Sequence, residues 1–86
     1  PLDLTTLAAA AGWTLHHFAR EFRRVTGMPP HAFVKARRMQ RALELLRTTA
    51  LPIADVAERV GFVSTSHFHV AFRRHHGVSP AMARSR

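Results

Sequence analysis

The sequence has no cysteine among its 86 residues, which excludes a disulfide framework, a thiolate nucleophile and a cysteine-based zinc finger. It has no tyrosine, no Asn-Gly or Asp-Gly turn and no sustained apolar–polar alternation, so signals for β-strands are missing. No apolar run approaches the ~18 residues that a membrane-spanning helix needs. Acidic residues are scarce, since 5 Asp and Glu stand against 13 Lys and Arg. The resulting net charge of +8 predicts a polyanionic partner.

What the sequence does contain is typical of a small folded domain. An apolar fraction of 47% is too high for a disordered basic tail. The four glycines follow apolar-periodic stretches, where helices end, and prolines stand at or just before the next stretch. The pattern predicts an all-α fold with helices over 4–11, 15–26, 30–48, 53–60 and 65–76, and a last turn or two opened by Ser79-Pro80. The predicted N-caps are Asp3, Thr14 and either Ser64 or Thr65.

Apolar spacing also predicts which helix faces are buried. On 15–26 these are Phe18, Phe22 and Val25, and on 65–76 the pair Phe68 and Phe72. The longest helix presents a stripe of five apolar residues, Phe33, Ala36, Met39, Leu43 and Leu46.

The chain repeats itself. Residues 4–13 match residues 53–62 in pattern, and after a one-residue insertion at Val63 the segment 17–30 returns as 67–80. In both copies the second segment carries His-Phe, a later Phe-Arg-Arg, a Gly and a Pro at the same spacing. Two copies are too few for a solenoid, so we expect two small lobes joined by the long helix.

Each copy consists of a short helix, a tight Gly-aromatic turn and a second helix with basic residues. That layout is typical of a helix-turn-helix, whose second helix enters the major groove. A plain helical hairpin with a solvated arginine face is the alternative. A 19-residue helix is about 28 Å long, and successive major-groove faces are about 34–36 Å apart. The helix predicted over 30–48 therefore has a suitable length for one monomer to place its two lobes in successive major grooves.

These motifs resemble a known family. The segment Leu7-Ala8-Ala9-Ala10-Ala11-Gly12, the run from His17 to Arg24, and Ser66-His67-Phe68 with Gly77-Val78-Ser79-Pro80 look like the DNA-binding domain of AraC/XylS-type bacterial transcription regulators. The resemblance implies seven helices, one of them before Pro1, in two helix-turn-helix subdomains (1–29 and 49–86) joined by a linking helix (30–48). It also implies a double-stranded DNA operator and RNA polymerase as partners, an effector or dimerisation domain upstream, and a bacterial cytoplasmic, nucleoid-associated location.

Base-reading residues are predicted on both second helices. His16, Arg20 and Arg23 lie opposite the aromatic face of 15–26, and the resemblance points to His16, Ala19 and Arg20. A bidentate Arg on guanine contributes about 1–3 kcal/mol of discrimination. On 65–76 the matching positions are Thr65, Ser66, His69 and Val70, with Arg73 beside them. Val70 stands where the family often carries a base-reading Arg, so we expect weaker base discrimination there. Ala83 replaces a frequent aromatic, which predicts a loosely held C-terminal turn.

Phosphate contacts are predicted for the helix caps and the flanking arginines, of which about half would touch DNA. They are Thr14, Arg23, Arg24, Arg37, Arg38, Arg41, Ser64, Arg73 and Arg74.

Other functions have less support. The adjacent histidines point about 100° apart on a helix and no carboxylate or cysteine completes a ligand set, so neither a metal nor a cofactor is predicted. His17 and His67 are predicted to be partly buried beside core phenylalanines. The sequence has no phosphate loop and no catalytic carboxylate pair, so it does not indicate an enzyme. The alternative function is a basic helical module that contacts RNA polymerase or an anionic membrane surface.

Overall fold

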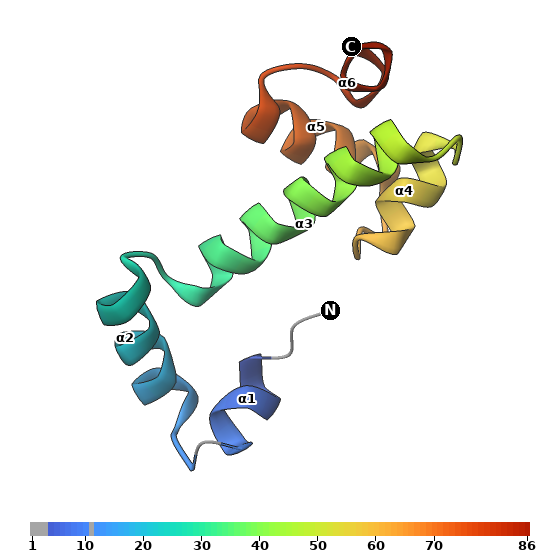
Figure 1. Ribbon diagram of the computed structural model, residues 1–86. Helices are drawn as coiled ribbons and strands as arrows, with labels where there is room; N and C mark the ends of the chain where they lie inside the picture. Colours follow the sequence, from blue (N-terminus) through green and yellow to red (C-terminus); the bar gives the residue numbers. More distant parts are fainter. Residues whose placement is uncertain (1–3, 11) are drawn as a thin grey trace. The chain divides into compact units, whose positions relative to one another are not determined.

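The computed structural model describes residues 4–10 and 12–86, and every regular element within them is a helix (Figure 1). In chain order the helices are α1 Leu4–Ala10, α2 Leu15–Thr26, α3 Pro30–Thr48, α4 Ile53–Arg59, α5 Thr65–His76 and α6 Pro80–Ser85. The all-α prediction is confirmed, and so are the predicted bounds of α2, α3 and α5. Helix α4 ends one residue early because Val60 forms its C-cap. The predicted cap Asp3 and the predicted helix end Ala11 lie outside the described residues.

The chain divides into two compact units, residues 1–35 and 36–86, and the division falls inside α3. We call them the first unit and the second unit and describe each by itself.

The second unit has a continuous hydrophobic core. Phe68 and Phe72 of α5 are fully buried, and each packs edge-on or tilted against another aromatic ring of the unit. Around them lie the buried residues Met39, Ala42, Leu45, Leu46, Val56, Ala57, Val60 and Ala83. The stripe predicted for α3 is confirmed at Met39 and Leu46, while Ala36 and Leu43 are half-buried. Because truncating a buried Phe costs about 3–5 kcal/mol, these two rings anchor α5 firmly in the core.

The first unit is held by a chain of aromatic rings. Phe18 and Phe22 lie 5.8 Å apart between ring centroids, and Phe22 meets Phe33 edge-on at 5.2 Å. None of the twelve residues of α2 is buried. The prediction that Val25 is buried was wrong, since its side chain is 73% exposed. Helical periodicity places Val25 on the aromatic face, but no described residue covers the last turn of that face.

Histidine burial differs between the repeats. His17 is half-buried as predicted, with its ring stacked on Trp13 at 4.9 Å. His67 is exposed, so the prediction for it was wrong. The aromatic residue at the matching turn, Phe62, packs edge-on against Phe68 in the core, and no ring of the described residues is stacked on His67.

The C-terminal turn is not loosely held, contrary to expectation. Helix α6 begins at the Ser79 cap, whose Oγ accepts a 3.1 Å hydrogen bond from the Met82 N–H. Ala83 is only 2% exposed because a methyl group fits the space left in the core. The following residue, Arg84, donates hydrogen bonds to main-chain carbonyls of Leu46 and Leu51. These contacts hold α6 without the aromatic residue.

Candidate nucleic-acid interface

The tight turn of each helix-turn-helix has the same hydrogen bonds. The glycine N–H donates to the carbonyl three residues back, and the N–H of the following aromatic residue donates five residues back. The distances are 3.0 and 2.9 Å in both units, for Gly12 and Trp13 and for Gly61 and Phe62. This pair of bonds satisfies the last carbonyls of a helix and requires a left-handed residue, and both glycines have positive φ, 72° and 95°. The repeat in the sequence is therefore also a repeat in backbone structure.

The two candidate recognition helices, α2 and α5, also begin and end alike. Thr14 Oγ1 accepts from the His17 N–H at 3.0 Å, and Ser64 Oγ accepts from the His67 N–H at 3.2 Å. At the other end a left-handed glycine donates to the carbonyl four residues back, at 2.8 Å in both helices. The predictions of Thr14 and Ser64 as caps are confirmed. Each hydroxyl accepts from the backbone and keeps its own hydrogen, which can be donated to a phosphate oxygen.

On α2 the predicted base-reading side chains lie on the outer surface. His16 and Arg20 are exposed, and Ala19 is half-buried. Glu21 forms its ion pair with Arg24, between Oε2 and Nε at 2.9 Å, and not with Arg20. The Arg20 guanidinium is therefore available on the exposed face of the helix, where a planar fork can meet a base edge.

On α5 the predicted residues are exposed except the first. Ser66, His69 and Val70 are exposed, Val70 by 52%, and Thr65 is half-buried. His69 Nδ1 lies 3.2 Å from the Thr65 carbonyl oxygen. Because that oxygen can only accept, Nδ1 carries the hydrogen in this contact. In the neutral ring, Nε2 is then an acceptor.

The predicted phosphate-binding arginines differ in their surroundings. Arg23, Arg37, Arg73 and Arg74 are exposed. Two others take part in exposed ion pairs within one helix, Arg24 with Glu21 at 2.9 Å and Arg41 with Glu44 at 3.0 Å. Such pairs contribute only about 0–1 kcal/mol, so a phosphate can replace the carboxylate.

Arg38 is held more closely. It is half-buried, and its guanidinium carbon lies 3.4 Å from the position that a β-carbon on Gly61 would occupy. The guanidinium therefore lies over the turn between α4 and α5, whereas the described residues beyond the chain neighbours of Gly12 place no atom within 4 Å of the corresponding position there.

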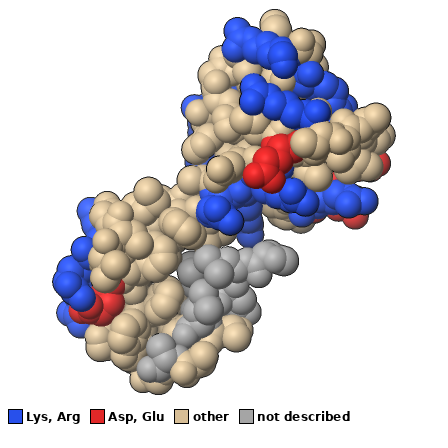
Figure 2. Space-filling view, viewed as in Figure 1, with Lys and Arg blue, Asp and Glu red and all other residues tan. Residues whose placement is uncertain are grey.

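Charge is concentrated in the second unit, which contains nine of the Lys and Arg residues and three of the Asp and Glu residues. Figure 2 shows Lys and Arg over much of the visible surface of this unit, interrupted by a few acidic side chains. This density favours a polyanionic ligand.

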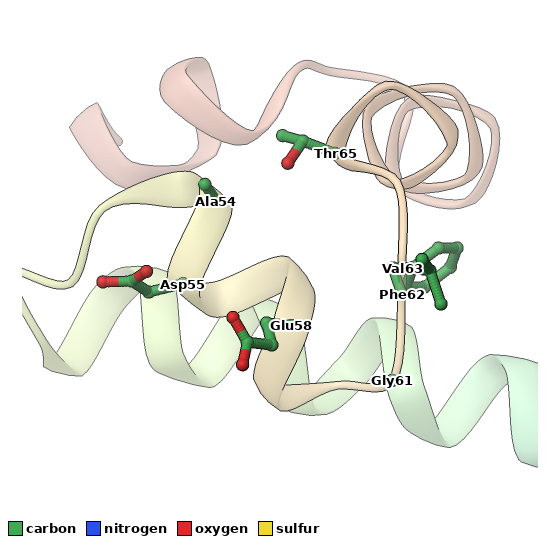
Figure 3. Close-up of a pocket in the computed structure, with 7 residues that line it drawn as sticks. All are labelled: Ala54, Asp55, Glu58, Gly61, Phe62, Val63 and Thr65. Atoms are coloured by element: carbon green, nitrogen blue, oxygen red, sulfur yellow. The ribbon is translucent and has the colours of Figure 1, made fainter.

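One hollow in the second unit is lined by acidic instead of basic side chains (Figure 3). Asp55 and Glu58 of α4 line it together with Thr65 at the start of α5 and the segment between them, in which Val63 is fully exposed. Both carboxylates are exposed and form no ion pair with the described residues. The two carboxylates repel phosphate, so the α4 side of the hollow suits a basic ligand, whereas Thr65 at the start of α5 is one of the predicted base-reading residues.

The described residues contain no group of three or more His, Cys, Asp or Glu side chains that could hold a metal ion. Within the same residues, no helix combines the length and the apolar character that crossing a bilayer requires.

Two capped helix-turn-helix units with basic, exposed second helices define a DNA-binding protein. A helix-turn-helix domain family matches residues 7–86, which is nearly the whole chain. The chain belongs to this family, the AraC-type helix-turn-helix domain of bacterial DNA-binding transcription regulators.

Curated relatives cover the chain almost completely. The Right origin-binding protein of Escherichia coli K12 is 39% identical over 84 residues, which are 98% of this chain and 29% of that protein. The HTH-type transcriptional regulator MtrA of Neisseria gonorrhoeae is 38% identical over 82 residues, 95% of this chain and 27% of that protein. The chain thus spans less than a third of the length of these relatives.

Solved structures agree with the fold. The DNA-binding domain of the transcriptional factor AdpA, in complex with a target DNA, has a TM-score of 0.88 and 38% identity, covering 99% of this chain and 77% of that one. An AraC-type transcriptional regulator from Chromobacterium violaceum has a TM-score of 0.89 and 28% identity, covering 99% and 76%.

Sequence reasoning missed two polar residues of the second unit, His76 and Arg84. Each donates to a main-chain carbonyl more than thirty residues away in the sequence. No local pattern signals such a bond, because every residue type offers the same carbonyl.

Proposed function

We propose that this chain binds a specific double-stranded DNA sequence to regulate transcription, with α2 and α5 in successive major grooves. The observation that carries the proposal is the repeated geometry. Each second helix is capped in the same way and turns an aromatic pair inward and polar side chains outward. The N-terminal residues of a recognition helix contact base edges, which are the positions occupied here by His16 and Ser66.

In the first unit we assign base reading to His16, Ala19 and Arg20. Arg20 offers a bidentate fork to O6 and N7 of guanine, and the small Ala19 lets the helix approach the base edges closely. In the second unit the readers are Thr65, Ser66, His69 and Val70. Val70 can contact only a thymine methyl, and the Nε2 of a neutral His69 ring can accept from the amino group of adenine or cytosine. The first half-site should therefore be read more sharply than the second.

Phosphate contacts position both helices. We assign them to the two capping hydroxyls and to seven arginines, of which about half contact DNA. The set is Thr14, Arg23, Arg24, Arg37, Arg38, Arg41, Ser64, Arg73 and Arg74. The subdomains 1–29 and 49–86 would then bind adjacent half-sites, with 30–48 as the link between them.

The test is selection of bound duplexes from random DNA, followed by affinity measurements at several salt concentrations. A paired motif spaced about one helical turn is expected. If about half of the seven arginines each neutralise a phosphate, the log–log slope of affinity against salt should be about −3 to −4. Arg73→Gln should make the slope less negative by about 0.9, whereas Arg47→Gln, an exposed arginine outside the assigned set, should leave it unchanged. A slope near zero would refute DNA binding, and tight binding to anionic vesicles would favour the membrane alternative.

RNA polymerase is the proposed protein partner, and the acidic hollow is where we expect a basic segment of it to contact the second unit. The exposed carboxylates of Asp55 and Glu58 beside the exposed Val63 support this surface. A photo-crosslinker at position 63 should capture a polymerase subunit on the selected DNA, and Asp55→Asn with Glu58→Gln should abolish capture without weakening DNA binding. Capture that survives this double substitution would place the contact elsewhere. An upstream effector or dimerisation domain and a bacterial cytoplasmic, nucleoid-associated location complete the proposal.

A further inference from the structure

Two side chains of the second unit bond to main-chain carbonyls of α3. His76, the last residue of α5, has Nε2 3.0 Å from the Met39 carbonyl oxygen, and because a carbonyl only accepts, Nε2 carries the hydrogen. Arg84 of α6 donates from Nε to the Leu46 carbonyl at 3.0 Å and from Nη2 to the Leu51 carbonyl at 2.6 Å.

The acceptors lie in an ordered arrangement on the helix. Met39 and Leu46 are seven residues apart, which is about two helical turns, so their carbonyls lie on the same side of α3. Leu46 is in the last turn of α3, where carbonyls lack a partner within the helix and a positive charge is favoured. Leu51 lies in the segment that leads to α4. One guanidinium thus caps α3 and fixes the start of the second helix-turn-helix.

The His76 ring has a second contact. Its centroid lies 4.4 Å from that of Phe72, which is fully buried in the core. The ring is therefore held between the core and the backbone of α3, at the end of the recognition helix.

The first unit has no such bonds at the equivalent positions. Thr26 stands where the repeat places His76, and its hydroxyl donates to the Phe22 carbonyl in its own helix, at 2.7 Å. Val34 stands at the position of Arg84 and has no side-chain donor. The bonds to α3 are therefore a property of the second unit and not of the repeated motif.

We propose that His76 and Arg84 are positioning residues. His76 holds the end of α5 on α3, and Arg84 holds α6 and the segment before α4 on the end of α3, so that together they set the orientation of α5; Arg84 serves in this way instead of contacting phosphate. The proposal rests on the proposed function for the part that concerns DNA. Because α5 is assigned the weaker base contacts, its half-site depends more on DNA shape and phosphate contacts. Such contacts distinguish DNA sequences only when the helix is held in one orientation, so the bonds that fix α5 matter more.

The test uses the 86-residue chain and a duplex obtained by selection, with variants whose second half-site is scrambled. Arg84→Met keeps the aliphatic stem and removes the donors, and Arg86→Met is the matched control because Arg86 is exposed at the end of α6. His76→Leu removes the ring donor, and His76→Gln restores an N–H at a similar reach. Each variant is assayed below its unfolding transition, which circular dichroism defines.

Arg84→Met and His76→Leu should each lower the discrimination between the intact and scrambled second half-site by about fivefold or more. His76→Gln should recover most of it, Arg86→Met should change nothing, and discrimination at the first half-site should stay the same. The salt slope of Arg84→Met should equal that of the wild type.

Loss of about 0.9 from the slope of Arg84→Met would show a phosphate contact and overturn the proposal. Retained discrimination with lowered stability would overturn it as well, since the role would then be structural only.

Amide hydrogen exchange in the DNA-free protein provides a test that does not depend on DNA binding. Residues 65–76 should exchange faster in Arg84→Met than in Arg86→Met, and equal rates would refute the positioning role. Absence of discrimination by the wild type would refute the proposed function instead.

Discussion

Replacing Arg20 with Ala tests the unequal roles of the two recognition helices. Arg20 is exposed and Glu21 is paired with Arg24, so the substitution removes no ion pair from the unbound protein. Stability should change by less than about 0.5 kcal/mol. A lost bidentate contact to guanine costs about 1–3 kcal/mol, which is roughly 5- to 150-fold in affinity for the preferred base.

The comparison is Val70→Ala at the equivalent position of the second unit. Val70 is 52% exposed, and the substitution removes two methyl groups of which a thymine methyl covers only part. At about 0.8 kcal/mol for each fully buried group, the loss should be no more than about fivefold. Arg20→Lys keeps the charge without the planar fork, so it should recover only the charge-dependent part of the affinity and less of the preference for guanine.

The assay is fluorescence anisotropy with the selected duplex and its single-base variants, at one salt concentration. Arg20→Ala should flatten the preference at one position of the first half-site. Equal losses of specificity from Arg20→Ala and Val70→Ala would refute the assignment. An equal loss of affinity for every duplex would show that Arg20 contacts a phosphate and does not read a base.

Two further predictions concern stability and are measured by urea unfolding. Phe72→Ala should cost about 3–5 kcal/mol because the ring is fully buried, whereas Phe22→Ala should cost less than half as much because no residue of α2 is buried. Equal costs would contradict the difference between the two cores. Ser64→Ala should lower the free energy of unfolding by about 1 kcal/mol through the lost cap. Ser66→Ala, two residues later and exposed, should cost almost nothing. A cost for Ser66→Ala as large as that for Ser64→Ala would contradict the assignment of the cap.

Much of the fold could be predicted from the sequence because its signals are local. The hydroxyl caps at Thr14 and Ser64 bond to an N–H three residues later, and the turn at Gly61 closes within five residues. The aromatic spacing of Phe68 and Phe72 likewise lies within one helix. Such signals do not depend on distant partners, so the bounds of α2, α3 and α5 and the repeated unit were predicted correctly.

Predictions that needed a distant partner were less successful. Val25 has the spacing of a buried residue but no described residue covers it, and His67 lacks the stacking ring that His17 finds in Trp13. Ala83 suggested a loose end, but it fills a space that only the assembled core defines. Burial depends on what packs against a face, and periodicity describes only the face itself.

The sequence by itself thus determined the helices, the two helix-turn-helix motifs and the excess of positive charge, because caps, turns and composition are properties of short segments. Only the tertiary structure decided which of the positive side chains are available to a ligand. Arg20 and Arg73 remain exposed, Arg38 lies over the turn at Gly61, and Arg84 is bonded to the backbone of the second unit. These arginines are the same residue type, and they differ because the guanidiniums of Arg38 and Arg84 meet atoms supplied by distant parts of the chain, whereas Arg20 and Arg73 stay exposed.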